Sequence, residues 1–120
     1  MTDRVRFIEH RSKQVLLIDF SQATKQEILA LLYKVQKTVA AEPPGSVLIL
    51  ADFDHAEIDK DVSIRMKEVL VFDRPYVKRA AWVGTGTLPN VFYQSFKSFS
   101  QRDFPTFKTR EEALDSLVAD

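Results

Sequence analysis

The pattern of apolar and polar positions along the chain predicts five strands and four helices. Val47–Ala51 is a continuous apolar run, which is typical of a central strand that is covered on both faces of its sheet. Four other stretches have the alternating or β-rich pattern of strands: residues 4–9, 14–20, 78–84 and 104–108. Apolar residues that recur every three or four positions predict helices over residues 21–41, 59–71 and 109–118, and a further helix that Thr87 or Asn90 caps.

The predicted helices have recognisable signals at their ends. Thr24 and Glu27 have the spacing of a capping box, in which each side chain satisfies a backbone N–H that the helix leaves free. Pro43 follows the first helix and ends it, because proline cannot donate a helical hydrogen bond. Asp59 or Asp61 is expected to cap the helix that follows the central strand.

These elements follow one another in the order β-β-α-β-α-β-α-β-α, which predicts an α/β fold with a mixed, mostly parallel five-stranded sheet. Only a short polar turn separates the first two strands, so we expect an antiparallel hairpin. A long helix separates the second strand from Val47–Ala51, which predicts a right-handed crossover between parallel strands. Pro105 restricts the last strand to an edge. Because no internal repeat divides the chain, we expect residues 1–120 to form a single domain.

Composition narrows the class of protein. The chain has 120 residues, with 17 basic and 17 acidic side chains and no cysteine. The absence of cysteine excludes thiol catalysis, disulfides and cysteine-ligated zinc. The balanced charge argues against nucleic-acid binding, which usually needs a basic excess. The N-terminal residues are charged throughout, and no apolar run is long enough to cross a bilayer, so we expect a cytoplasmic protein.

Three stretches carry information beyond their secondary structure. They are the buried strand, acidic loop and helix of VLILADFDHAEIDKDVSIRMKEVL, the strand and glycine of AAWVG, and the ending FPTFKTREEALDSL, in which Thr109 and Glu112 have the capping-box spacing. Together they resemble the STAS domain superfamily, in its SpoIIAA-like branch. The resemblance covers nearly the whole chain and implies the fold predicted above.

The resemblance implies one regulatory role, that of an anti-sigma-factor antagonist. Such proteins bind a partner kinase and are switched by phosphorylation of a serine at the start of the second helix, in a pattern like D-S-S-G. Here Lys60 and Asp61 stand where the serines would be, and Ser63 lies beyond them, so the phosphorylatable serine is missing. In this hypothesis a protein partner binds the acidic loop and second helix through Asp54, Glu57, Asp59 and Asp61.

The SpoIIAA-like fold is also similar to CRAL-TRIO lipid-binding domains, which implies an apolar ligand instead. Phe92, Phe96 and Phe99 predict an aromatic stripe on the third helix, with basic residues beside it. Such a segment also fits peripheral contact with a membrane or a homo-oligomer interface. Our leading hypothesis is a non-enzymatic module that binds an apolar or lipid-like ligand between the sheet and the second and third helices. The predicted ligand-binding residues are Phe72, Tyr76, Phe92, Tyr93, Phe96 and Phe99.

The acidic residues after the central strand raise a third hypothesis. Asp52 and Asp54 resemble the Asp-x-Asp of haloacid-dehalogenase-type phosphatases, and hard cations favour clustered carboxylates. The further motifs and the length of those enzymes are missing. His55 has no nucleophile at an evident position, and the Gly84–Gly86 loop lacks a phosphate-binding fingerprint. We therefore predict no catalytic residue, no metal site and no cofactor.

Overall fold

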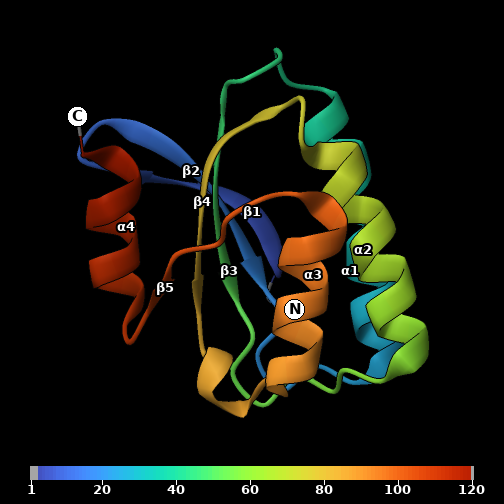
Figure 1. Ribbon diagram of the computed structural model, residues 1–120. Helices are drawn as coiled ribbons and strands as arrows, with labels where there is room; N and C mark the ends of the chain where they lie inside the picture. Colours follow the sequence, from blue (N-terminus) through green and yellow to red (C-terminus); the bar gives the residue numbers. More distant parts are fainter. Residues whose placement is uncertain (1–2, 120) are drawn as a thin grey trace.

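The computed structural model describes residues 3–119 and confirms the predicted order of elements (Figure 1). The strands are β1 (Val5–His10), β2 (Lys13–Asp19), β3 (Val47–Asp52), β4 (Val77–Val83) and β5 (Thr106–Phe107). The helices are α1 (Lys25–Ala40), α2 (Lys60–Asp73), α3 (Asn90–Ser100) and α4 (Arg110–Val118), with a short 3-10 helix, Thr85–Thr87, before α3.

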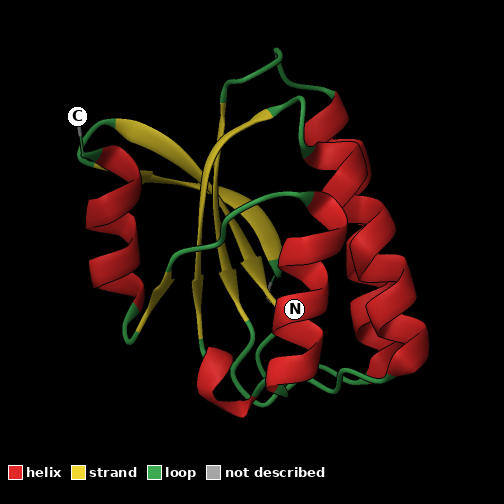
Figure 2. Ribbon diagram, in the orientation of Figure 1, coloured by secondary structure: helices red, strands yellow, loops and turns green. Residues whose placement is uncertain are grey.

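The strands form one mixed sheet in the sequential order β1-β2-β3-β4-β5. The β1–β2 pair is antiparallel, as predicted for a hairpin, and the other neighbouring pairs are parallel. The three crossovers, β2-α1-β3, β3-α2-β4 and β4-α3-β5, all move in the same direction across the sheet. Because parallel crossovers are right-handed, their helices α1, α2 and α3 lie on the same face of the sheet. Figures 1 and 2 show α1, α2 and α3 on that face and α4 on the opposite one.

Strand β3 lies in the middle of this sheet and is buried along its whole length, as predicted. Val47, Ile49 and Ala51 belong to the large core beneath α1, α2 and α3. Leu48 and Leu50 belong to the smaller core beneath α4. Successive side chains of a strand point to opposite faces, so a strand with a core on each side needs an unbroken apolar run.

The predicted capping residues are confirmed for three of the four helices, although α1 begins at Lys25 and not at residue 21. Thr24 caps α1 in a complete capping box, and Asp59, one of the two predicted candidates, caps α2. Thr109 caps α4 by accepting from the backbone N–H of Glu112. The predicted side-chain cap of α3 is wrong, because Pro89 occupies the cap position and no side chain there bonds the helix.

The aromatic face of α3 is rotated from the predicted one. Phe96 is fully buried, as expected, but Phe99 is 58% exposed. The buried face includes Ser100 in place of Phe99, and Phe92 and Tyr93 both lie half-buried beside it, with the ring of Tyr93 edge-on to Trp82. Residues 92, 96 and 99 and residues 93, 96 and 100 both have helical spacing, so periodicity alone did not distinguish the two faces.

Candidate functional site

Helix α2 connects the two regions that hold the candidate functional residues. The acidic loop, residues 52–61, connects the carboxyl end of β3 to the N-terminus of α2. The last two turns of α2, from Val69 to Asp73, form part of the wall of a buried cavity against the sheet. In α/β sheets, functional groups commonly gather outside the carboxyl ends of parallel strands, which is where the acidic loop lies.

Two of the predicted partner-binding residues are engaged with a lysine from α1. The ammonium of Lys25 lies 2.9 Å from Oδ2 of Asp59 and 2.8 Å from Oδ2 of Asp61. The backbone N–H of Val62 and then Lys25 lower the pKa of Asp59, and hydrogen bonds to Asp61 and Asp59 raise the pKa of Lys25. The start of α2 is therefore less negative than its sequence suggests.

The turn between β3 and α2 packs closely against the loop that follows β4. Asp54 lies 3.0 Å from Nδ1 of His55, which itself adopts a left-handed backbone with φ of 55°. The backbone N–H of His55 donates to Thr87 across 2.8 Å. A Cβ added to Gly84 would lie 2.4 Å from the backbone nitrogen of Asp54, so only glycine permits this approach.

Glu57 differs from the other predicted partner-binding residues. It is exposed, and no described residue of the range 3–119 forms an ion pair or hydrogen bond with its carboxylate. Its backbone N–H donates to the backbone oxygen of Ala23, which fixes the position of the residue without engaging its charge. Of the four predicted carboxylates, this is the one with its full charge directed to solvent.

Sequence reasoning missed an ion-pair cluster at the ends of β2 and β3. Arg110, the first residue of α4, donates from Nε to Asp52 across 2.9 Å, and its Nη2 lies 3.3 Å from Asp19. Asp52 also accepts a hydrogen bond from the backbone N–H of Asp54. The carboxylate that resembled a phosphatase nucleophile is therefore held by an arginine and a backbone N–H.

The positions that correspond to the phosphorylation pattern have the exposure expected of a helix start. Lys60 and Asp61 are exposed, whereas Ser63 is 5% exposed. Because Ser63 faces inward, it does not offer a surface hydroxyl in place of the missing serine. Across residues 3–119, no group of three or more His, Cys, Asp or Glu side chains is arranged to hold a metal ion.

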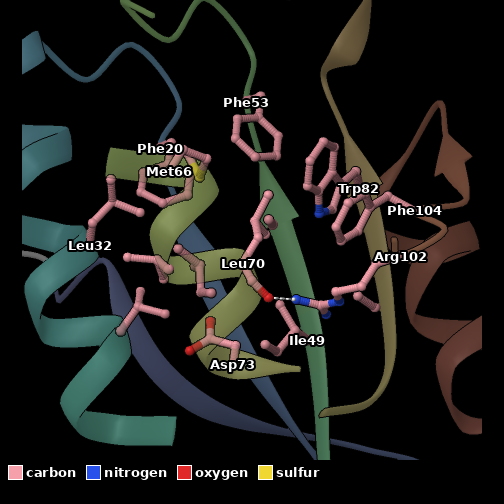
Figure 3. Close-up of a pocket in the computed structure, with 15 residues that line it drawn as sticks. Phe20, Leu32, Ile49, Phe53, Met66, Leu70, Asp73, Trp82, Arg102 and Phe104 are labelled. Atoms are coloured by element: carbon pink, nitrogen blue, oxygen red, sulfur yellow. Dashed lines mark hydrogen bonds between the residues drawn. The ribbon is translucent and has the colours of Figure 1, made fainter. Parts of the chain in front are cut away.

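The cavity lies between the sheet, α1, α2 and the segment that joins α3 to β5 (Figure 3). Its volume is about 30 Å³, and its walls are apolar apart from Asp73 and Arg102. Asp73 is 3% exposed, and its Oδ1 has no hydrogen-bond partner among the described residues. Burial raises the pKa of Asp73 to about 7, although the charge of Arg102 opposes the shift.

Arg102 enters the same cavity from the segment between α3 and β5. Its Nη1 donates to the backbone oxygen of Leu70 across 3.0 Å, and its guanidinium lies 4.9 Å from the ring centre of Phe104. Burial lowers the pKa of Arg102, and Asp73 partly opposes that effect. Within the described residues, Asp73 and Arg102 influence each other by charge but form no direct ion pair.

None of the six predicted ligand-binding aromatic residues lines this cavity. Phe96 and Tyr93 instead pack around Trp82, and the hydroxyl of Tyr93 donates to the backbone oxygen of Phe104 across 2.9 Å. Phe72 is 38% exposed and its ring lies 6.0 Å from that of Tyr76 at the end of α2. The aromatic residues thus divide between core, helix end and surface.

The geometry defines a class of protein: an α/β domain with a hairpin at one sheet edge, three helices on one face and a C-terminal helix on the other. The chain matches the solved structure of an anti-sigma-factor antagonist (STAS) domain protein from Planctomyces limnophilus, with a TM-score of 0.63 over 96% of this chain and 98% of that chain. The two are 12% identical, so the match shows the fold alone. The protein has the STAS fold, SpoIIAA-like, that its motifs predicted.

Sequence comparisons add no further relative. No protein-family model matches the chain, and no curated protein matches it in sequence. Among the described residues, no helix has both the length and the apolar character needed to cross a membrane.

Proposed function

We propose that this protein is a regulatory domain that binds another protein through the acidic loop and the exposed side of α2, and that it catalyses no reaction itself. The STAS fold supports a role of this type, since the similar structure is described as an anti-sigma-factor antagonist domain protein. The proposed partner-binding residues are those of the acidic loop: Asp54, Glu57, Asp59 and Asp61.

The observation that carries the proposal is an exposed apolar strip that begins about one turn beyond the acidic loop and extends toward the C-terminal end of α2. The strip consists of Ile64 and Val71 on α2 and Phe99 on α3, with exposed fractions of 49%, 45% and 58%. Ile64 and Val71 are two turns apart on one side of α2, and Lys67 lies between them with its ammonium 5.5 Å from the ring centre of Phe99. Adjacent exposed apolar side chains with charges at one end are typical of protein-binding surfaces.

The missing serine changes what kind of regulator we propose. Asp61 stands at a serine position of the resemblance and is held by Lys25, so the start of α2 carries a permanent carboxylate. A permanent charge cannot be added or removed by a kinase or phosphatase. We therefore propose that partner binding is constitutive with respect to phosphorylation at this position.

The test uses two surface substitutions that spare the helix cap. Glu57→Lys combined with Ile64→Lys changes the loop and the strip without touching Asp59 or its hydrogen bond to Val62. Purified wild type and variant are immobilised and exposed to extract of the source cells, and bound proteins are identified by mass spectrometry. We expect a stoichiometric partner that the double variant loses and that Glu111→Lys, which makes the same charge change as Glu57→Lys but on α4, retains.

Two results would count against the proposal. If the double variant and the Glu111→Lys control bind the same proteins equally well, α2 is not the binding surface. If the circular dichroism spectrum or unfolding midpoint of the double variant departs from that of wild type, Glu57→Lys alone replaces it, since that position makes no side-chain contact to lose.

The apolar-ligand hypothesis for the six aromatic residues stays a prediction. The cavity volume of about 30 Å³ has room for about two water molecules, which is too small for a lipid chain without movement of the walls. Extraction of the purified protein followed by mass spectrometry tests it, and Phe96→Asp should abolish any bound apolar species.

A further inference from the structure

The polar lining of the cavity consists of a buried carboxyl group, of which one oxygen has no partner among the described residues, and an arginine. Asp73 is almost completely buried, and its Oδ1 lacks a hydrogen-bond partner among residues 3–119. Arg102 points into the same space, but its hydrogen bond goes to the uncharged backbone oxygen of Leu70 (Figure 3). Buried polar groups in folded proteins are normally paired, so an unpaired carboxyl oxygen beside a cavity indicates that a polar molecule or group occupies that cavity.

The charges at this end select an anion. The guanidinium of Arg102 keeps its positive charge in proteins, and no carboxylate of the described residues contacts it. Burial favours the neutral form of Asp73, which can then donate a hydrogen bond from its own hydroxyl. A group with two acceptor oxygens and one negative charge would accept from both side chains and balance the charge.

The remaining walls decide what kind of anion fits. The side chains that α1, β2, β3 and β4 contribute to the cavity are all apolar. Among residues 3–119, Asp73 and Arg102 are therefore the only titratable groups that line it, and Arg74 is the further charge that acts on Arg102. A phosphate or sulfate would leave oxygens facing these apolar walls without partners. A carboxylate on a short hydrocarbon stem places its oxygens beside Asp73 and Arg102, while its stem extends toward the side of the cavity that Ala80 and Arg102 line.

The size of the cavity and its surroundings limit the length of the hydrocarbon stem. About 30 Å³ has room for about two water molecules or one group of carboxylate size. Outside it lies an open hollow of about 310 Å³ that includes the basic residues Arg74, Lys78 and Arg79 and the acidic residue Asp103. Ala80 and Arg102 line both the cavity and the hollow, so an anion attracted to the basic hollow reaches the cavity past Arg102.

We propose that the end of the cavity between α2 and the α3–β5 segment binds the carboxylate of a small monocarboxylic acid, held between Arg102 and the buried carboxyl group of Asp73. This site is separate from the acidic loop and from the strip on α2, so either proposal stands without the other.

Propionate is the first probe, because its stem is short and its charge is fixed near neutral pH. Sodium propionate is titrated at about pH 6 against sodium chloride of equal ionic strength, with the fluorescence of Trp82, the one tryptophan of the chain and a wall of the cavity, as the readout. We expect a saturable change with propionate, and none with 1-propanol or propylammonium, which have similar size but a different charge.

Substitutions of Arg102 and Lys78 test which side chains bind propionate. Arg102→Met should weaken propionate binding by at least about tenfold, since a charge-assisted hydrogen bond is lost. Lys78→Met, which removes a cation from the outer hollow alone, should weaken it by less than about threefold and mainly at low salt. If Arg102→Met fails to fold, Arg102→Lys serves, because it keeps the charge but loses the planar donor pair and should still weaken binding.

The pH dependence of propionate binding is the most direct test of the role of Asp73. In the wild type, affinity should fall by on the order of tenfold per pH unit above about pH 7, because ionised Asp73 repels the carboxylate and can no longer donate. Asp73→Asn carries no ionisable group but keeps an N–H donor, so its affinity should stay constant over the same range. Equal pH profiles, equal binding of propanol, or no saturable response to propionate would each overturn the proposal.

Discussion

Arg110, the first residue of α4, binds the carboxylate of Asp52, the last residue of β3, with a distance of 2.8 Å between Nη2 and Oδ2. Asp52 is 8% exposed, so this is a largely buried carboxylate whose charge is balanced by a single arginine. The same guanidinium reaches Asp19 at the end of β2. One side chain therefore fixes the start of α4 to the ends of two parallel strands on the sheet that α4 covers.

The first prediction concerns this arginine. Arg110→Met should lower the free energy of unfolding by roughly 1–3 kcal/mol, because it leaves a buried carboxylate without its cation, while the partial exposure of Arg110 limits the loss. Urea denaturation measures the change. Arg11→Met is the control: Arg11 pairs with Asp115 at 3.1 Å but its side chain is 67% exposed, so we expect a loss below about 1 kcal/mol. Equal losses in the two variants would contradict the structural role of Arg110.

The loop after β4 offers a matched pair of glycines. Gly84 has φ of 72°, and an added Cβ would lie 2.4 Å from the backbone nitrogen of Asp54. Gly84→Ala should therefore destabilise the protein by more than about 2 kcal/mol, since it combines backbone strain with a clash against backbone. A Cβ added at Gly86 would have no other atom within 4 Å, so Gly86→Ala should change stability by less than about 1 kcal/mol. Thermal or urea unfolding of both variants measures the change in stability. If Gly84→Ala is as stable as wild type, the loop after β4 does not contact the loop after β3.

The rotated face of α3 is tested by two phenylalanines on the same helix. Phe96 is fully buried against Trp82, so Phe96→Ala should cost roughly 3–5 kcal/mol. Phe99 is 58% exposed, so Phe99→Ala should change stability by about 0.5 kcal/mol or less. Urea denaturation compares the two. A large loss of stability in both variants would show that Phe99 is buried, as the spacing of residues 92, 96 and 99 predicted.

The features that sequence predicted are those that depend on neighbours along the chain. The capping box of Thr24 and Glu27 and the cap at Asp59 are set within three residues, and the apolar run of β3 reflects burial on both faces. The order of elements, with the rule for crossovers, was then sufficient to predict a mixed sheet between two layers of helices.

The features that sequence missed join residues far apart. Lys25 reaches Asp61 across 36 positions and Arg110 reaches Asp52 across 58, and no local pattern selects such partners from the many charges present. Asp73 was different, because a signal existed. It follows Met66 and Leu70 at helical spacing, which places a carboxyl group on the buried face of α2. The helix predicted from the sequence ends at residue 71, two residues before Asp73, whereas α2 includes Asp73.

The buried carboxyl of Asp73 makes the stability of the protein depend on pH. Its pKa is about 7 in the folded chain, above the value of 3.8 expected when it is exposed, so between these values the unfolded chain loses a proton that the folded chain keeps. The contribution of Asp73 to the free energy of unfolding should therefore fall as pH rises from about 4 to about 7, by up to about 4 kcal/mol, and stay constant above that. Asp73→Asn has no proton to lose, so its stability relative to wild type should increase across this window and level off beyond it. Urea denaturation at intervals of pH measures the difference, and a difference that does not change with pH would show that Asp73 is ionised in the folded protein throughout.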